Sequence, residues 1–140
     1  VGYKPLRNTL EAPTITSSSD AAIYLLEGFD HDTLALKEMC VIGFLNRANR
    51  LIGLYKASSG GICGTVLDPR LVFAVALKVS AVSLILAHNH PSGSLLPSTA
   101  DKDLTRKISE AGKLLDIKVL DHLILSPDGS SFSFADENLL

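Results

Sequence analysis

The first part of the chain changes from scattered polar residues to an apolar pattern with helical spacing. Residues 1–17 contain two prolines among polar side chains, which predicts an irregular N-terminal arm. The serine-rich run 17–20 is a helix start signal, and the apolar residues after it predict a helix or helix pair reaching about Leu36. We therefore expect the arm to be followed by one domain over residues 18–140.

Two apolar runs in the next part of the chain predict a β-hairpin. Residues 38–45 and 50–57 contain β-branched and aromatic side chains, and the polar residues 46–49 separate them. The basic residues 47 and 50 lie within this turn and directly after it, and we interpret this basic cluster as part of a solvated loop. The sequence Ser-Ser-Gly-Gly at 58–61 then breaks the second predicted strand.

The middle of the chain predicts a helix followed by a central strand. Asp68 is a suitable N-cap, and Pro69 is suited to the first helical position. The predicted helix over 70–79 is apolar nearly all round, so we expect it to be buried. Residues 81–87 form a continuous apolar run of strand length, as expected for a strand covered on both faces.

The last part of the chain predicts one long helix and two strands. Residues 98–115 have helical spacing, with one apolar stripe formed by Leu104, Ile108, Ala111 and Leu115. Residues 117–125 alternate less cleanly but predict a strand, and a turn leads from it into a short strand over 131–134. The order of all elements predicts an α/β fold, a three-layer α-β-α sandwich around a mixed sheet.

Composition is typical of a globular protein with one core. The chain has 140 residues, of which 46% are hydrophobic and 20% charged. No apolar stretch approaches the roughly 18 residues of a transmembrane helix, and residues 1–5 do not resemble a signal peptide. Cys40 and Cys63 form no motif and are expected to be reduced thiols. We therefore expect a cytoplasmic protein without membrane contact.

The candidate chemistry lies directly after the predicted central strand, in the segment 88–101, HNHPSGSLLPSTAD. His88 and His90 are two residues apart, so in extended backbone their side chains point to the same side. Ser98 and Asp101 are three apart at a predicted helix start and share a helix face. Two imidazoles and a carboxylate are three ligands, the number of a catalytic zinc site with a fourth position for water, whose pKa zinc lowers to about 7.

Such a site also needs a proton carrier and a group that stabilises an oxyanion. Glu38, at the start of the first predicted strand, is a candidate for the first role, and Ser98 is a candidate for the second. Each piece also has a structural explanation. Ser98 and Asp101 can form a helix cap, residues 91–93 are an ordinary turn, and Glu38 can be a solvated strand end. Only the combination favours a metal site.

Other polar residues leave two interpretations open. Asp121 and His122 lie inside an apolar strand, where they form either a hydrogen-bonded structural pair or a group that orients a metal-binding histidine. Asn89 and Ser92 can line the site or make the turn. His31 is expected to be solvent-exposed.

The motif residues resemble a known family. His88-x-His90-Pro91 followed by Ser98-x-x-Asp101 resembles the JAMM (MPN+) metalloprotease signature, and the fuller string with Ser92 and Gly93 resembles the bacterial RadC family. The resemblance covers roughly residues 20–135. It also includes Glu38 and the segments 44–49, 64–65, 68–70 and 120–124. Two positions depart from the family's habit: Leu71 stands where Glu is common, and Ser94 where Asp is common.

This resemblance implies a JAB/MPN fold of cytidine deaminase-like architecture and a set of site residues. His88, His90 and Asp101 would bind one Zn²⁺ per chain, Glu38 would be the general acid/base, and Ser98 would support the tetrahedral intermediate. JAMM enzymes hydrolyse peptide or isopeptide bonds, so a peptide or protein substrate is expected. A deaminase is excluded because the sequence lacks the His-x-Glu and Pro-Cys-x-x-Cys motifs.

The alternative function is a non-catalytic zinc-binding accessory domain in DNA repair, recombination or mobile-element biology, since DNA repair is the family's historical label. Direct DNA binding by this domain is not expected, because its net charge is −2 and DNA-binding domains carry clustered Lys and Arg. The helix-hairpin-helix region that the family often carries has no counterpart in these residues. Self-association into a homo-oligomer is a further possibility.

Overall fold

A computed structural model of the protein describes residues 2–5, 11–59 and 67–140. Within these residues the chain forms the following elements in order: β1 (Gly2–Pro5), α1 (Ser18–Leu25), the 3-10 turns η1 (Leu26–Gly28) and η2 (His31–Thr33), β2 (Met39–Leu45), β3 (Leu51–Ser59), α3 (Pro69–Lys78), β4 (Ser83–Asn89), α4 (Thr99–Leu114), β5 (Lys118–Leu125) and β6 (Ser131–Ser133). None of the described helices is long and apolar enough to cross a membrane.

The described strands form one mixed sheet in the order β1-β3-β2-β4-β5-β6. Neighbouring strands are antiparallel except β4 and β5, which run parallel. A parallel pair needs a long crossover, and α4 lies in the connection between β4 and β5. β2 and β4 are buried along their whole length because they lie at the centre of the sheet.

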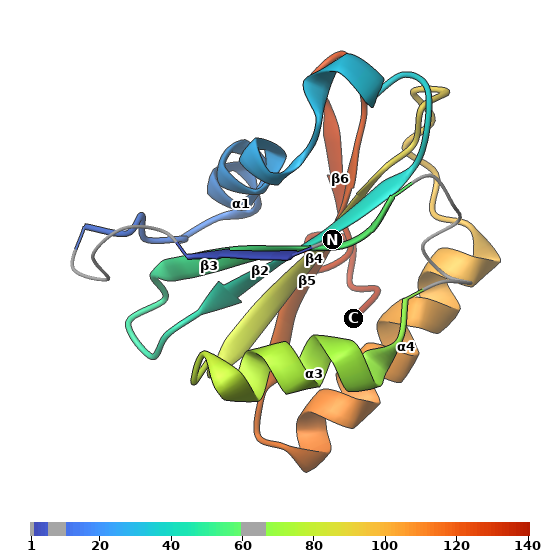
Figure 1. Ribbon diagram of the computed structural model, residues 1–140. Helices are drawn as coiled ribbons and strands as arrows, with labels where there is room; N and C mark the ends of the chain where they lie inside the picture. Colours follow the sequence, from blue (N-terminus) through green and yellow to red (C-terminus); the bar gives the residue numbers. More distant parts are fainter. Residues whose placement is uncertain (1, 6–10, 60–66) are drawn as a thin grey trace.

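Helices cover both faces of this sheet (Figure 1). The alternating side chains of β2 follow the two layers: Ile42 and Phe44 pack in the core beneath α3 and α4, whereas Val41 and Leu45 pack in the core beneath α1. This arrangement confirms the predicted three-layer α-β-α sandwich.

The N-terminal arm and the first helix differ from the prediction. The arm is not irregular over residues 2–5, because β1 pairs with β3, 49 residues further along, where the Tyr3 hydroxyl donates to the Ile52 carbonyl oxygen. The predicted helix or helix pair is one short α-helix that ends at Leu25, followed by the two 3-10 turns. The long-range pairing of β1 has no local signal in the sequence.

The predicted burial of the middle helix is wrong on one side. In α3, Val72, Phe73 and Ala76 are buried, but the side chains of Leu71 and Leu77 are more than half exposed. In α4 the expected stripe holds for Leu104 and Ile108, whereas Leu115 is the C-cap residue and is partly exposed. Strand β3 continues to Ser59, past the predicted start of the break at residue 58. Gly60, Gly61, Cys63, Gly64 and Thr65 lie outside the described residues, and Cys40 is buried in β2.

Candidate metal centre

The end of β4 carries the two histidines of the motif. His88 pairs with Cys40 of β2 on one side and with Ile124 of β5 on the other, so its ring is almost fully buried. The backbone N–H of His90 donates to the carbonyl oxygen of Leu125 at 3.0 Å, which continues the pairing with β5 beyond the last residue of β4. The rings of His88 and His90 therefore lie next to each other on the face of the sheet that α3 and α4 cover.

The start of α4 is a capping box that orients the carboxylate. The Asp101 backbone N–H donates to Ser98 Oγ at 3.0 Å, and the Ser98 N–H donates to Asp101 Oδ2 at 2.8 Å. The cap explanation of these two residues is therefore confirmed. It does not exclude a role in binding a metal ion, because the same carboxylate is held facing the histidines.

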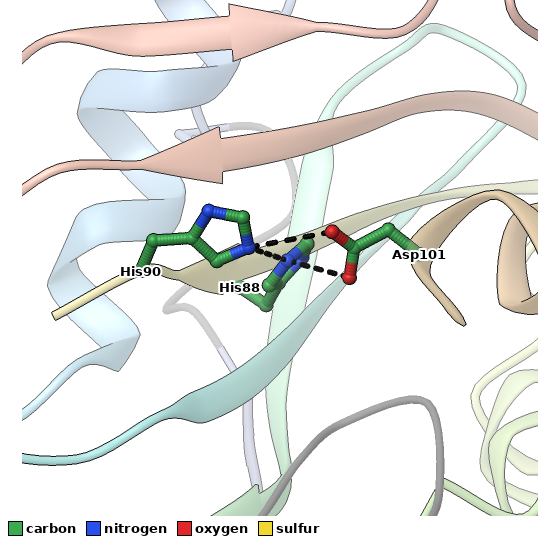
Figure 2. A group of neighbouring side chains, drawn as sticks. All are labelled: His88, His90 and Asp101. Atoms are coloured by element: carbon green, nitrogen blue, oxygen red, sulfur yellow. Dashed lines mark hydrogen bonds and ion pairs between the residues drawn. The ribbon is translucent and has the colours of Figure 1, made fainter. Parts of the chain in front are cut away.

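Three side chains converge at this point (Figure 2). His88 Nε2 lies 3.0 Å from Asp101 Oδ1, and His90 Nε2 lies 3.3 Å from Asp101 Oδ2. The two Nε2 atoms are 3.0 Å apart, and one ligand atom from each residue lies within 4.8 Å of the others. The ring of His90 is the more accessible one, with 13% of its side chain exposed against 1% for His88. The predicted ligands His88, His90 and Asp101 are thus brought together.

The hydrogen-bond partners of these side chains indicate which of their atoms can bind a metal ion. His90 Nδ1 lies 2.8 Å from the carbonyl oxygen of Ser94, which can only accept, so this nitrogen carries a hydrogen and Nε2 is the ring nitrogen that faces the cluster. Burial raises the pKa of Asp101, but hydrogen bonds and charge from His88 and the hydrogen bonds with Ser98 outweigh it and hold this pKa well below its usual range. A carboxylate and two imidazole Nε2 atoms are ligand types that fit a divalent metal ion.

The turn after His90 places the carbonyl oxygen of Ser94. The Gly93 N–H donates to the His90 carbonyl oxygen at 3.0 Å, and Gly93 has a φ of +85°, which L side chains rarely adopt. The ring of His90 uses the backbone of Ser94, while the Ser94 side chain accepts a hydrogen bond from the Leu96 N–H. Serine in place of the family's usual aspartate therefore leaves the contact with His90 intact. Ser92 is exposed in this turn.

His122 of β5 contacts His88, the buried member of the predicted ligand set. Its Nε2 lies 2.7 Å from His88 Nδ1, and its ring is completely buried. Burial and the charge of His88 hold the pKa of His122 well below its usual value, so the ring is neutral. A register shift in β5 places Leu86 opposite His122 and so turns His122 toward α4. The same irregularity explains why the apolar alternation of this strand is imperfect in the sequence.

Asp121 does not pair with the ring of His122. Its carboxylate accepts hydrogen bonds from the backbone N–H groups of His122 and Ala135 and from the hydroxyl of Ser133. Burial raises the pKa of this carboxyl. Of the two interpretations of this dipeptide, His122 thus contacts a predicted ligand, and Asp121 anchors the strand to the segment after β6.

Glu38 lies immediately before β2 and is half-buried. Within the part of the chain that the structure describes, its side chain makes no hydrogen bond or ion pair with His88, His90 or Asp101. It is nevertheless tied to their strand through its neighbour: the Met39 N–H donates to Asn89 Oδ1 at 2.7 Å. His31, in η2, is exposed as predicted.

Asn89 holds the segment that contains Glu38. Besides accepting from Met39, its side-chain amide donates to the carbonyl oxygens of Leu34 and Lys37 at 2.8 and 3.0 Å. The residue is fully buried between the two histidines, so it is neither an exposed turn residue nor a solvent-facing lining residue. An amide at a buried strand position was the available signal for this role, because such a group needs partners.

Replacing Asn89 by alanine removes these three hydrogen bonds and leaves their backbone partners buried. We expect the free energy of unfolding to fall by about 2–4 kcal/mol, since each lost buried hydrogen bond costs about 1 kcal/mol or more. Urea denaturation of the two metal-free proteins measures the difference. A change below about 0.5 kcal/mol would show that the amide does not hold this segment.

This chain is similar to known proteins over most of its length. The family model described as RadC-like JAB domain matches residues 15–139. A UPF0758 protein of Flavobacterium johnsoniae is 46% identical over 130 residues, which cover 93% of this chain and 55% of that protein. A UPF0758 protein of Haemophilus influenzae is 37% identical over 134 residues, covering 96% of this chain and 59% of that protein. The chain thus spans little more than half the length of these relatives.

Proposed function

This chain belongs to the RadC-like JAB domain family, and from that premise we propose that it is a zinc-dependent hydrolase that cleaves a peptide or isopeptide amide bond. The observation that carries the proposal is the convergence of His88 Nε2, His90 Nε2 and the Asp101 carboxylate. Three nitrogen and oxygen ligands are the usual protein contribution to a catalytic zinc site, which keeps a further position open. A bound zinc ion supplies a Lewis acid that polarises a carbonyl and lowers the pKa of water to about 7.

The protein's own residues divide the remaining work. His88 and His90 would hold the metal through their Nε2 atoms, and Asp101 would hold it through its carboxylate. Glu38 accepts the proton of the attacking water and returns it to the leaving amine. The Ser98 hydroxyl donates to the oxygen of the amide carbonyl as negative charge develops on it.

Three observations support Glu38 as the proton carrier. Cys40 of β2 pairs with His88 of β4, and continuing this antiparallel register by two residues brings Glu38 opposite His90. The three hydrogen bonds of Asn89 hold the backbone on both sides of Glu38 against the strand that carries the histidines. The carboxylate of Glu38 is also not engaged by another described residue.

The hydrogen-bond pattern of Ser98 supports its role as a donor. Its Oγ accepts from the Asp101 N–H, and no acceptor for its own hydrogen is present among the described residues. The side chain is exposed at the N-terminus of α4, next to the carboxylate that faces the histidines. Its hydroxyl hydrogen is therefore available to a substrate oxygen at this point.

The test is a cleavage assay with a panel of peptides and lysine-linked isopeptides. The zinc-loaded protein should release products that mass spectrometry detects, and a chelator should stop the reaction until zinc is restored. A protein that binds one zinc ion per chain but cleaves no member of a broad panel would contradict the hydrolase. That result would favour the non-catalytic accessory domain instead.

A further inference from the structure

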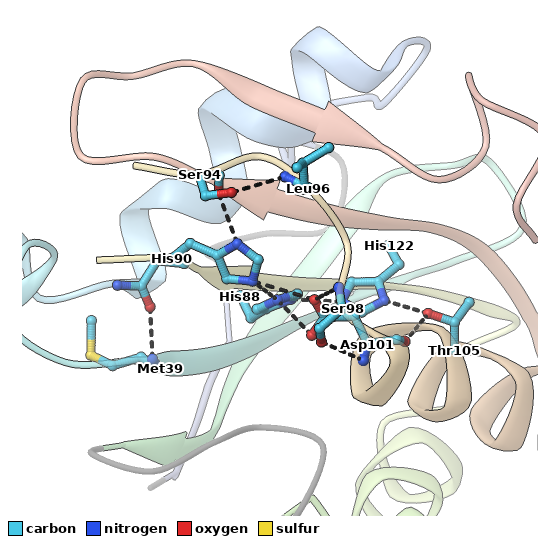
Figure 3. A network of polar contacts seen from close by, with 10 residues as sticks. Met39, His88, His90, Ser94, Leu96, Ser98, Asp101, Thr105 and His122 are labelled. Atoms are coloured by element: carbon cyan, nitrogen blue, oxygen red, sulfur yellow. Dashed lines mark hydrogen bonds and ion pairs between the residues drawn. The ribbon is translucent and has the colours of Figure 1, made fainter. Parts of the chain in front are cut away.

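A closed chain of contacts links two of the proposed ligands through buried side chains (Figure 3). Thr105 Oγ1, one turn along α4, lies 2.9 Å from the backbone carbonyl oxygen of Asp101 and within hydrogen-bond distance of His122 Nδ1. His122 Nε2 in turn lies 2.7 Å from His88 Nδ1, and His88 Nε2 lies 3.0 Å from Asp101 Oδ1. This series of contacts therefore connects the backbone carbonyl oxygen of Asp101 with the carboxylate of the same residue.

The donor and acceptor of each hydrogen bond in this series follow from the partners of Thr105. A threonine hydroxyl has one hydrogen, and the carbonyl oxygen of Asp101 can only accept, so Thr105 donates there and its oxygen accepts from His122 Nδ1–H. A neutral imidazole with its hydrogen on Nδ1 has a lone pair on Nε2. His122 Nε2 therefore accepts from His88 Nδ1–H, which leaves His88 Nε2, inside the ligand cluster, as the nitrogen that can bind a metal ion.

We propose that His122, anchored by Thr105, is a positioning residue that fixes the orientation and hydrogen position of the His88 ring so that Nε2 is presented to the metal. The inference rests on the proposed metal site and adds to it two residues that do not touch the ion. Metal-binding histidines generally depend on a partner at their second ring nitrogen. Here that partner is a second histidine, and its own orientation is set by a hydroxyl on the helix that carries Asp101.

The surroundings of His122 suit a rigid support. The ring is fully buried and stacks on Phe134, with ring centroids 4.5 Å apart and an interplanar angle of 15°. Water therefore has no access to take the place of either partner. These contacts join β4, β5 and α4. They therefore also fix the position of His88 relative to Asp101, although the two residues come from different elements.

The matched variants Thr105→Val and Thr105→Ser test this inference. Valine keeps the shape of threonine but lacks the hydroxyl, whereas serine keeps it. Competition with a chromophoric chelator should show zinc affinity about 10–100-fold lower for Thr105→Val and close to wild type for Thr105→Ser. Urea denaturation of the metal-free proteins identifies any loss of fold. Equal affinities in all three proteins, or equal losses in both variants, would overturn the inference.

The ring hydrogens of the wild-type protein provide a measurement that needs no variant. Imidazole ¹⁵N chemical shifts of the zinc-loaded protein should show the hydrogen of His122 on Nδ1 and that of His88 on Nδ1. A hydrogen on His122 Nε2 would overturn the inference even if Thr105→Val fails to fold. If wild type binds zinc, a failure of these tests concerns His122 alone. A wild-type protein that binds no zinc would overturn the proposed function and this inference with it.

Discussion

Replacing Glu38 by glutamine is expected to lower kcat by about 10²–10⁴-fold on any peptide or isopeptide that the zinc-loaded protein cleaves, because general acid–base catalysis contributes about that much. Glutamine keeps the size of the side chain but cannot accept a proton. Zinc binding should be unchanged, since Glu38 is not one of the residues that converge with His88. Steady-state kinetics and metal analysis of the same preparations measure the two quantities together.

Glu110→Gln is the matched control for this experiment. Glu110 is an exposed glutamate on α4 and makes no hydrogen bond or ion pair with another described residue, so its replacement removes the same charge without touching the site. The control should cleave the substrate at the wild-type rate. Wild-type turnover in Glu38→Gln would show that another group carries the proton. Loss of zinc in this variant would mean that Glu38 is a ligand instead.

Asp101→Asn is expected to abolish the stabilisation of the protein by zinc. A ligand that binds only the folded state at 1,000 times its Kd stabilises it by about 4 kcal/mol, which corresponds to a rise in Tm of roughly 14 °C for a domain of this size. Asparagine removes the negative charge that the metal needs. Its amide oxygen can still accept the hydrogen bond from the Ser98 N–H, so the metal-free protein should keep its helix cap and lose only the contact of the charged carboxylate with His88.

Ser98→Ala is expected to have the opposite pattern of effects: it should weaken the helix cap and leave zinc binding unchanged. It removes the oxygen that accepts from the Asp101 N–H, which should lower the stability of the metal-free protein by about 1 kcal/mol. The carboxylate remains, so zinc should still raise Tm. Thermal unfolding of wild type and both variants, with and without zinc, gives all six values. A full rise in Asp101→Asn would contradict the assignment of its carboxylate as a ligand.

The spacing of the motif predicted that His88, His90 and Asp101 could converge, because the relative placement of these side chains depends mainly on residues close in sequence. His88 and His90 follow each other on one face of extended backbone, and Asp101 is three residues from Ser98 on a helix. The cap and the metal site first stood as alternatives for Ser98 and Asp101. In the structure Asp101 Oδ2 accepts from the backbone of Ser98 while both carboxylate oxygens face the histidines, so the cap leaves the carboxylate placed where it could bind a metal ion.

The remaining features depend on pairings between distant segments. The contact between His122 and His88 requires the irregularity in β5, and the role of Asn89 requires residues 34–39 to lie against β4. Neither pairing follows from the periodicity of its own strand. The burial of α3 was overestimated because apolar composition does not show which side of a helix lacks a neighbour: Leu71 and Leu77 are exposed although both are leucines.

The central claim is that His88, His90 and Asp101 hold a zinc ion, and anomalous diffraction tests it most directly. Crystals of the protein grown with equimolar zinc should give one anomalous peak at the zinc edge, located among His88 Nε2, His90 Nε2 and the Asp101 carboxylate. No peak at this position, or a peak only at other residues, would contradict the claim.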